Sequence, residues 1–413
     1  MSNEAVSSET MSNEALKADA RTAVILGGAR TPFGRFRGSL AALSASELGA
    51  HAIRSALERT GVDPGQVQAV IVGQVIQAGA GQGPARQASL AAGIGWDVPT
   101  VTINKLCLSG LTAVIDAARM IRAGEADFIV AGGQESMSNA PHLFQGLRHG
   151  VAIGDAPLVD ALNFDALQDP VSGVLQGAAT DAGNAERGIS RADQDEVAAT
   201  SHQRSEAARS AGLFAAEIAP VKVPQRRGPA LMVDSDEGIR PGTTTEALAA
   251  LKPAFSAAAS ATITAGSASP LSDGAAAVVV ASKAAAERAG LSWIAEIRSH
   301  GQTAGPDASL HSQPSRAIER ALAAEGLGVA DLDLIEINEA FASVIIQSAR
   351  DLGVSTERIN AEGGAIALGH PVGASGARLV LHQALALQRR GGGTGVVSLC
   401  GGGGQGEALI LKA

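Results

Sequence analysis

One segment of this 413-residue chain occurs twice, and this internal repeat limits the possible folds more than any other feature. The run AIRSALERTGVDPGQVQAVIV, starting at Ala52, aligns without a gap with AIERALAAEGLGVADLDLIEI, starting at Ala317, at a constant offset of 317 − 52 = 265 residues. Each copy predicts a helix, a glycine stop and a strand in the same order. The repeat therefore indicates two halves of one design, whose sites mirror each other.

Helix and strand patterns also alternate around the first copy. The expected elements are strands at residues 22–26, 69–72 and 128–130 and helices at 46–59 and 111–122. This alternation is typical of parallel strands with crossover helices, so we expect an α/β fold. The halves also end alike, because the strands at 128–130 and 396–399 both run into glycines. We interpret the late glycine clusters as tight turns and sites of close backbone approach. The first strand should likewise break at Gly27-Gly28, although no G-x-G-x-x-G that would favour a dinucleotide opens a helix there.

The alternation fails between the two halves, from about residue 134 to residue 260. This stretch contains a helix capped by Ser190 and Asp193 and four basic residues, Lys222, Arg226, Arg227 and Arg240, which suit either an anionic ligand or a solvated loop. We interpret it as a loop domain inserted into the first half, with the halves at residues 21–290 and 291–413. Residues 1–20 carry MSNEA twice and read as a disordered leader, with Met11 as an alternative start.

Composition excludes several classes of function. The net charge is −9, aromatic residues make up 2% and tyrosine is absent, which argues against nucleic-acid binding. The only two cysteines, Cys107 and Cys400, show neither C-x-x-C nor zinc-ligand spacing, so a disulfide framework or structural metal is not expected. No apolar run approaches the ~18 residues of a membrane span and the N-terminus is not of the secretory type, so we predict no membrane association and a cytoplasmic location.

Cys107 lies in NKLCLSG, between the strand-like TVTIN and the helical LSGLTAVIDAARMIRAG. We expect it at the helix N-terminus, where unpaired N–H groups and the helix dipole favour an anion. This field predicts a thiol pKa below its ordinary value of about 8.5, and the thiolate is the nucleophilic form. A lone cysteine is also a common inert core residue, so its position leaves both interpretations open.

Three further positions carry reactive or polar groups next to glycines or strand ends. His370 in GGAIALGHPVGASGAR is a candidate base or an exposed loop residue, and Cys400 before GGGGQG is a candidate thiol or a buried strand end. Asn338 and Glu339 end the strand of the second repeat copy. Because ligands of α/β proteins bind at the carboxyl ends of parallel strands, these positions together predict a site.

Six motifs, in order over residues 22–413, resemble the motif series of the thiolases. They are NKLCLSG, AGGQESMSNAPH, TAGSASPLSDGAAAV, NEAFA, GGAIALGHPVGASGAR and CGGGGQG. Within that family the chain is most similar to acetyl-CoA acetyltransferases and related 3-ketoacyl-CoA thiolases. The resemblance implies a five-layer α-β-α-β-α fold of two similar halves with an inserted loop domain. It also implies a homodimer or homotetramer that uses acetyl-CoA, acetoacetyl-CoA or longer 3-ketoacyl-CoA and CoA as substrates, with no metal or tightly bound cofactor.

The resemblance implies a role for each catalytic residue. Cys107 would be the acylated nucleophile, and His370 would take its proton. Asn338, through a held water, would help His370 form one oxyanion hole, while the backbone amides of Cys107 and Gly402 form the other. Cys400 would remove the α-proton of the second acetyl-CoA and, in the reverse direction, protonate the leaving CoA thiolate. A Claisen condensation needs this division between acyl storage, carbon deprotonation and oxyanion stabilisation.

The substrate contacts that the resemblance implies come from both halves and from the loop domain. They are Ala265, Ser269, Ala340 and Phe341 along the pantetheine channel and Leu167, Arg226 and Phe255 at the nucleotide end. One departure concerns the acyl pocket, where Leu175 and Gln176 replace the His-Met pair of acetoacetyl-specific members. Acyl chain length, the net direction of the reaction and dimer against tetramer therefore stay open.

Two rival functions fit parts of the pattern. A decarboxylating ketoacyl synthase uses one cysteine with two histidines or with a histidine and an asparagine, so Cys400 as a second sulfur argues against it. A non-catalytic binder of lipid or CoA is disfavoured because Cys107, Asn338, His370 and Cys400 are all present. Cleavage of 3-ketoacyl-CoA in the presence of CoA distinguishes the enzyme from the binder.

Overall fold

The computed structural model describes residues 19–413, so the leader predicted at residues 1–20 lies almost wholly outside the described part. Nine strands pair in the order β12-β13-β14-β11-β1-β10-β5-β3-β4, and β2 pairs with β10 beside this path. The strands of this sheet are β1 (Ala23–Arg30), β2 (Gly34–Arg35), β3 (Ala69–Gly73), β4 (Thr100–Ile103), β5 (Phe128–Ser136), β10 (Ser272–Ser282), β11 (Ala295–Ala304), β12 (Leu334–Ile337), β13 (Thr394–Gly401) and β14 (Gln405–Lys412).

The path consists of two segments with the same topology. The order β3-β5-β10-β1 in the first half matches β12-β13-β14-β11 in the second, with one parallel pair followed by antiparallel pairs in each. Only two residue pairs, Val24 with Glu296 and Ile25 with Ala295, join β1 to β11. Each of the two halves that the repeat predicts therefore contributes one segment of the sheet. The two segments join at a narrow seam between β1 and β11.

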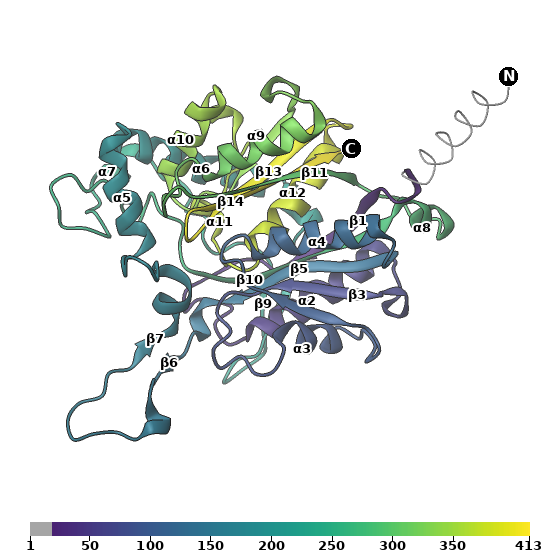
Figure 1. Ribbon diagram of the computed structural model, residues 1–413, viewed down its shortest axis with the longest axis horizontal. Coiled ribbons are helices and arrows are strands. Elements are labelled where there is room, and N and C mark those ends of the chain that lie inside the picture. Colours follow the sequence, from purple (N-terminus) through teal and green to yellow (C-terminus); the bar gives the residue numbers. More distant parts are fainter. Residues whose placement is uncertain (1–18) are drawn as a thin grey trace.

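Helices complete the layers on both faces of each sheet segment. They are α2 (Ala45–Thr60), α3 (Pro84–Ala91), α4 (Ser109–Ala123), α8 (Lys283–Arg288), α9 (Gln313–Glu325), α10 (Ala342–Leu352), α11 (Ala365–Leu368) and α12 (Ser375–Arg389). Figure 1 shows α2 and α3 outside the first sheet, α9 and α10 outside the second, and α4 and α12 between the sheets. One apolar cluster joins α4 and α12 to strands of both sheets. The predicted five-layer α-β-α-β-α fold is confirmed.

Local signals explain where the repeated helices begin and end. Ser44 and Glu47 form a capping box at the start of α2. Gly61 after α2 and Gly326 after α9 both adopt left-handed conformations, with φ of 69° and 68°. These glycines are equivalent in the repeat (326 − 61 = 265), so the predicted glycine stops are confirmed.

The predicted break of the first strand at Gly27-Gly28 is wrong, because β1 continues through these glycines, and β5 likewise continues through Gly132-Gly133. These strands are crowded by their neighbours: a Cβ at Gly28 would overlap the carbonyl oxygen of Ala277, and one at Gly133 would overlap that of Gly373. Here glycine permits close backbone approach within the sheet instead of a turn.

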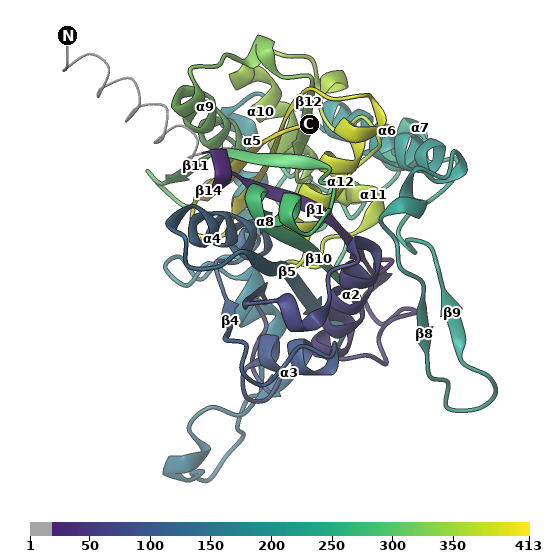
Figure 2. The ribbon, with the colours of Figure 1, turned by 90° about the vertical axis from the view of Figure 1, so that its right-hand side faces the viewer.

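Between β5 and β10 the chain leaves the sheet in what we call the excursion. Its elements are the hairpin β6 (His142–Leu143) and β7 (Val159–Asp160), the π-helix η4 (Leu162–Leu167), α5 (Gln176–Glu186), α6 (Arg191–Ser210), the hairpin β8 (Val221–Val223) and β9 (Leu231–Val233), and α7 (Thr245–Ala249). The capping box of Ser190 with Asp193 opens α6 as predicted. Figure 2 shows the β8–β9 hairpin projecting from the body of the molecule. The boundaries at 134, 260 and 290 stay predictions.

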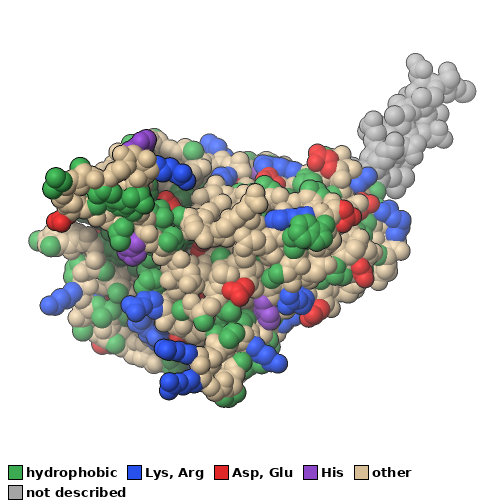
Figure 3. All heavy atoms as spheres, turned by 90° about the horizontal axis from the view of Figure 1, so that it is seen from below, with side chains coloured by type: hydrophobic (Ala, Val, Ile, Leu, Met, Phe, Trp, Pro, Cys, Tyr) green, Lys and Arg blue, Asp and Glu red, His purple; other side chains and the backbone are tan. Residues whose placement is uncertain are grey.

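A buried ion network attaches the excursion to the first half. Arg30 on β1 is fully buried and binds Asp236 at 2.6 and 2.8 Å and Glu217 at 2.8 Å. Both carboxylates belong to the excursion, and Glu217 also binds His382 of α12 at 3.0 Å. Apolar side chains remain exposed at the opposite end of the excursion, at the left of Figure 3, and include Val151, Ile153, Leu158, Phe164 and Val171. Within residues 19–413 no helix is long and apolar enough to cross a membrane.

Candidate active site

The site forms where the N-termini of the two central helices meet. α4 follows Cys107, and α12 follows His370. A Cβ on Gly110 of α4 would lie 2.8 Å from the carbonyl oxygen of Gly373, and one on Gly376 of α12 would overlap the backbone nitrogen of Leu111. Gly110 and Gly376 are each the second residue of their helix. Their missing side chains let the helix starts touch, which brings residues from the two halves together.

Cys107 is a buried thiol beside backbone donors. It lies two residues before α4, at the helix N-terminus as predicted, and Leu106 before it has a φ of 53°, an uncommon conformation for leucine. Burial raises the pKa of Cys107 to about 11, although the N–H groups of Cys107 and Gly402 act to lower it. The expectation that the helix N-terminus lowers this pKa is therefore wrong, because desolvation outweighs the donors. A resting thiol needs a base before it can attack.

His370 is a buried imidazole held at both ring nitrogens, and not an exposed loop residue. Its Nδ1 lies 2.6 Å from Oγ of Ser375, and Nδ2 of Asn338 lies 3.4 Å from its Nε2. Its backbone N–H donates to Oγ of Ser272 on β10 at 3.1 Å. Burial, together with the nearby positive charge of Arg378, lowers the pKa of His370 to about 4. The ring is thus neutral at physiological pH and able to accept a proton.

Cys400 and Asn338 extend the site from neighbouring strands. Cys400 lies near the end of β13, is buried, and packs with Ala340 and Val344. Burial raises its pKa well above the ordinary value, and the nearby Cys107 sulfur raises it further. Asn338 directly follows β12, is fully buried, and its Oδ1 has no hydrogen-bond partner among the described residues. Asn338 and Cys400 thus lie at strand ends of the second half, and Asn338 reaches the His370 ring.

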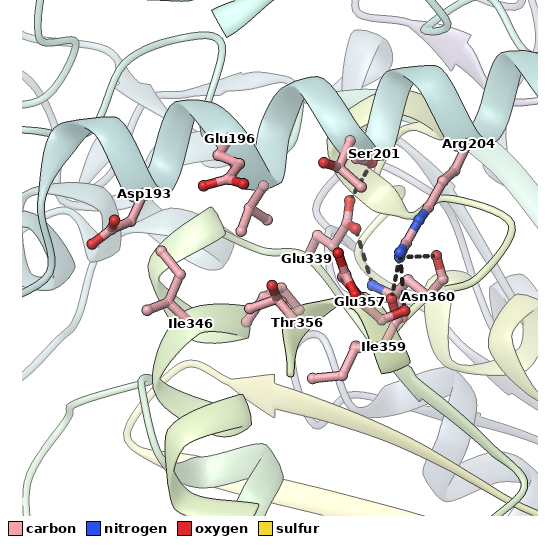
Figure 4. Close-up of a pocket in the computed structure, with 13 residues that line it drawn as sticks. Asp193, Glu196, Ser201, Arg204, Glu339, Ile346, Thr356, Glu357, Ile359 and Asn360 are labelled. Atoms are coloured by element: carbon pink, nitrogen blue, oxygen red, sulfur yellow. Dashed lines mark hydrogen bonds between the residues drawn. The ribbon is translucent and has the colours of Figure 1, made fainter. Parts of the chain in front are cut away.

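Glu339 anchors the segment that carries Asn338. Its carboxylate accepts hydrogen bonds from Ser201 of α6 at 2.6 Å, from Asn360 at 3.0 Å and from the N–H of Ile366 at 3.0 Å. Figure 4 shows Glu339 pointing toward Ser201 and Asn360 beside a separate cavity of about 260 Å³. Through Ser201, the excursion therefore stabilises the segment that carries Asn338.

Gly402 lies in the turn between β13 and β14, at the other side of Cys107. Its N–H is one of the two backbone donors that act on the Cys107 sulfur. A Cβ at Gly402 would overlap the side chain of Gln176 and would lie 2.8 Å from Cδ1 of Leu106. Two backbone donors at one sulfur are the arrangement that stabilises negative charge on an attached oxygen.

A cavity of about 470 Å³ opens onto Cys107 and His370. Of the residues expected to contact the substrate, it is lined by Leu167, Phe255, Ala265, Ser269, Ala340 and Phe341, together with the pair Leu175 and Gln176. Phe255 and Phe341 meet edge to face with their ring centroids 5.9 Å apart. Residues from the first half, the excursion and the second half thus share one cavity.

Arg226 does not reach this cavity. It is exposed in the turn of the projecting β8–β9 hairpin, and Arg240 is the basic residue that lines the cavity. Spacing along a loop does not reveal which of the four basic residues the chain folds back toward the cavity, and a contact of Arg226 with the nucleotide end stays a prediction. In the part of the chain that the structure describes, no three His, Cys, Asp or Glu residues gather to hold a metal ion.

Two polar residues that the sequence did not single out organise the site. The buried carboxylate of Glu135 accepts from the N–H groups of Val75 at 2.9 Å, Ile76 at 3.2 Å and Gly373 at 3.0 Å, which links the two halves beside Cys107. Ser375 binds the His370 ring. Glu135 lies within a quoted motif and Ser375 five residues after His370, but their partners were visible only in the fold.

Comparisons with known proteins agree with this geometry. Residues 23–284 match the family description "Thiolase, N-terminal domain", and residues 291–413 match "Thiolase, C-terminal domain". The chain is 56% identical over 392 residues to a probable acetyl-CoA acetyltransferase of Mycobacterium leprae, covering 95% of this chain and 99% of the relative. It is 47% identical over 389 residues to the acetyl-CoA acetyltransferase of Cupriavidus necator, covering 94% and 98% of the two chains.

Proposed function

The chain belongs to the thiolase family, and on this premise we propose that it is an acetyl-CoA C-acetyltransferase. It cleaves 3-ketoacyl-CoA with CoA and, in reverse, condenses two acetyl-CoA into acetoacetyl-CoA and CoA. The observation that carries the proposal is that Cys107 and His370, from different halves, line one cavity with the sulfur of Cys400 nearby. Coenzyme A acts as substrate and product.

In the first step Cys107 stores the acyl group. Nε2 of His370 takes the thiol proton, the Cys107 sulfur attacks the thioester carbonyl, and the C=O electron pair moves onto oxygen. Collapse of this intermediate expels the CoA thiolate, which receives the proton from His370. In the next step the backbone amides of Cys107 and Gly402 stabilise the oxyanion that forms on the acyl group of the acyl-enzyme. His370 and a water held by Asn338 stabilise the second oxyanion, which forms on the thioester oxygen of the substrate.

In the second step Cys400 acts as the base that generates the carbanion of acetyl-CoA. Its thiolate removes the α-proton of the second acetyl-CoA, the resulting carbanion attacks the acyl carbonyl on Cys107, and collapse of this intermediate breaks the C–S bond to Cys107. The departing Cys107 thiolate then takes the proton from the Cys400 thiol, which restores the Cys400 thiolate. Burial that raises the pKa of Cys400 makes its thiolate a stronger base for a weakly acidic C–H bond. In the cleavage direction the Cys400 thiol protonates the departing acetyl-CoA carbanion, and His370 then takes the proton of the incoming CoA thiol, which is the reverse of the first step.

The cavity divides into a pantetheine channel and an acyl end. Ala265, Ser269, Ala340 and Phe341 line the channel, with Leu167 and Phe255 farther out and Arg240 as the cationic contact for the nucleotide end. Leu175 and Gln176 border the acyl end and set the preference for chain length. We also infer a homodimer or homotetramer, as in the family at large.

Two alternatives are less well supported. A ketoacyl synthase does not require the second sulfur that lies beside Cys107. A non-catalytic binder would not need a neutral buried histidine, an unpaired Asn338 oxygen and two backbone donors directed at one thiol.

Separate variants of the two cysteines test the mechanism. Cys107→Ala should abolish formation of an acyl-enzyme from radiolabelled acetyl-CoA. Cys400→Ala should still acylate but should lose condensation and thiolysis by at least ~10³-fold, since it lacks the base. Equal loss of acylation in both variants would contradict the assigned roles. Wild-type protein that binds CoA but turns over no 3-ketoacyl-CoA would support the binder.

A further inference from the structure

The hydrogen bonds around His370 constrain which of its nitrogens carries the proton. Ser375, the first residue of α12, is buried and its Oγ lies 2.6 Å from Nδ1. The same Oγ lies 3.0 Å from the carbonyl oxygen of Pro371, a group that can only accept. A serine hydroxyl has one proton, so if it is donated to Pro371 the oxygen must accept from the imidazole. Nδ1 then carries the hydrogen.

The equivalent serine of the first half supports this assignment. Ser109 is the first residue of α4, as Ser375 is of α12. Its Oγ donates to the carbonyl oxygen of Leu106 at 2.6 Å and accepts from the N–H of Lys105 at 2.8 Å. In both halves the serine hydroxyl thus donates to a carbonyl just upstream, and in the first half its oxygen also accepts from an N–H. In the second half the group in the place of that N–H donor is Nδ1 of His370.

The opposite side of the ring is consistent with the same tautomer. Nδ2 of Asn338, which can only donate, faces Nε2 at 3.4 Å. A hydrogen on Nε2 would point at this donor, whereas a bare Nε2 accepts from it. Ser272 and Ser375 also hold the residue at two points, its backbone and its ring, so the imidazole cannot easily turn over.

We propose that Ser375 is a positioning residue that fixes His370 in the tautomer with hydrogen on Nδ1, leaving Nε2 free to accept the thiol proton of Cys107. This inference rests on the proposed function, in which His370 is the base. Arg378, buried on the same helix, is the charged residue that acts on His370, and its positive charge keeps the ring neutral until the thiol proton arrives.

The assignment keeps the proton balance of the first step simple. The S–H bond of Cys107 breaks, its electron pair stays on sulfur, and the proton binds the Nε2 lone pair. The imidazolium that forms still donates from Nδ1 to Ser375, and the contact between Nε2 and Nδ2 of Asn338 gives way to the new N–H. The proton later leaves from Nε2 to the CoA thiolate, and the original tautomer returns.

Nitrogen NMR on the full-length enzyme tests the tautomer directly. Protein with ¹⁵N-labelled histidine shows for each ring which nitrogen is protonated, and the His370 signal is assigned by its loss in His370→Asn. We expect hydrogen on Nδ1 in the wild type and a mixed or reversed population in Ser375→Ala. Hydrogen on Nε2 in the wild type would overturn the proposal without any variant, even if Ser375→Ala did not fold.

Acylation kinetics give the second readout. Ser375→Ala should acylate on the order of 10- to 100-fold more slowly, short of the ~10²–10⁴-fold effect of losing a general base, with an unchanged KM for acetyl-CoA and an altered pH profile. Ser89→Ala is the matched control, since the buried Ser89 hydroxyl has no hydrogen-bond partner among the described residues. Acylation of Ser375→Ala at the wild-type rate, or slow acylation with the wild-type tautomer, would overturn the proposal.

These outcomes separate the inference from the function on which it rests. If Cys107→Ala still forms the acyl-enzyme, the proposed mechanism fails whatever the tautomer of His370. If the cysteine variants behave as expected while Nε2 of the wild type carries the hydrogen, only the role of Ser375 fails.

Discussion

At the scale of single residues, Cys107 shows two opposing effects on one sulfur. The backbone amides of Cys107 and Gly402 favour the thiolate, while burial favours the thiol and prevails, raising the pKa to about 11. A thiol of this kind is protected from adventitious reaction yet lies beside a neutral base. Reactivity therefore depends on His370 and on the bound substrate more than on the helix N-terminus.

The two basic residues Arg240 and Arg226 give a test at this scale. Arg240 lines the substrate cavity, whereas Arg226 lies in an exposed hairpin turn. Arg240→Ala should raise the KM for acetyl-CoA on the order of 10-fold, as expected for losing about 1.4 kcal/mol of a charge-assisted contact, with little change in kcat. Arg226→Ala, the control, should match the wild type in steady-state kinetics. A larger effect from Arg226 would place the nucleotide end of the substrate elsewhere.

Sequence reasoning found the residues whose type alone suggests chemistry. Cys107, His370, Asn338 and Cys400 are reactive or polar groups beside glycines or strand ends, and the fold gathers them. Glu135 could not be found this way, because its role depends on the N–H of Gly373, 238 residues away. Arg226 was preferred to Arg240 because both are basic residues in the same irregular stretch.

At the scale of elements, the crossing of α4 and α12 determines the geometry of the site. Each helix starts with a serine and a glycine at equivalent places, Ser109-Gly110 and Ser375-Gly376. The serines bind the chain just upstream, and the glycines permit the approach. The relative position of Cys107 and His370 is thus set by backbone contact between the two helices.

Adding one methyl group at this crossing should disturb both stability and activity. A Cβ in Gly376→Ala would overlap the backbone nitrogen of Leu111, so we expect a loss of about 1–3 kcal/mol in unfolding free energy from overpacking. Acylation should fall as well, because the His370 loop is displaced from Cys107. Gly328→Ala is the control. A Cβ at Gly328 would lie 3.7 Å from its nearest atom, and the φ of −112° at this residue is open to alanine. Denaturation curves and acylation rates check both expectations.

The periodic patterns predicted the helices closely but misjudged strand lengths. The helix expected at 111–122 runs over Ser109–Ala123, and the one expected at 46–59 over Ala45–Thr60. The strands expected at 22–26 and 128–130 continue to Arg30 and Ser136. Glycine has a strong local preference for turns, and only tertiary packing against Ala277 or Gly373 reveals why these glycines stay in strands.

At the scale of the whole molecule, a buried ionic network joins its three parts. Arg30 on β1, Glu217 and Asp236 in the excursion, and His382 on α12 form one connected set. Nδ1 of His382 lies 3.0 Å from Glu217, and its Nε2 lies 3.6 Å from Glu362. The first half, the excursion and the second half are therefore linked by charge as well as by apolar packing.

This network predicts how stability depends on pH. Burial lowers the pKa of His382, but Glu217 and Glu336 outweigh both burial and the opposing charge of Arg378, so the pKa is raised above 6.5. Stability from protonated His382 is therefore fully present below pH ~6.5 and is lost as pH rises through the raised folded-state pKa. The unfolding free energy of the wild type should fall over this range relative to His382→Gln.

Urea denaturation of both proteins between pH 6 and 9 measures this difference. Curves for wild type and variant that run parallel over the whole range would contradict the linkage. Glu217 does not confuse the comparison, because its pKa is lowered and its contribution is lost only as pH falls below ~4.5.

The repeat predicted the overall plan, because an ungapped match over helix, glycine and strand leaves little choice but two equivalent halves. It could not predict the seam, where only two residue pairs join β1 to β11. It also could not show how the excursion folds back, since ion pairs such as Arg30 with Asp236 join residues 206 positions apart.

The division of the site between two halves has a consequence for the order in which the enzyme is made. Ribosomal synthesis proceeds from the N-terminus, and domains generally fold as they emerge. Cys107 is synthesised with the first half of the chain, whereas Asn338, His370 and Cys400 are synthesised only with the second half. A nascent chain thus carries a nucleophile with neither its proton acceptor nor its partner sulfur. Under the proposed mechanism, chemistry on thioesters begins only when α12 docks against α4.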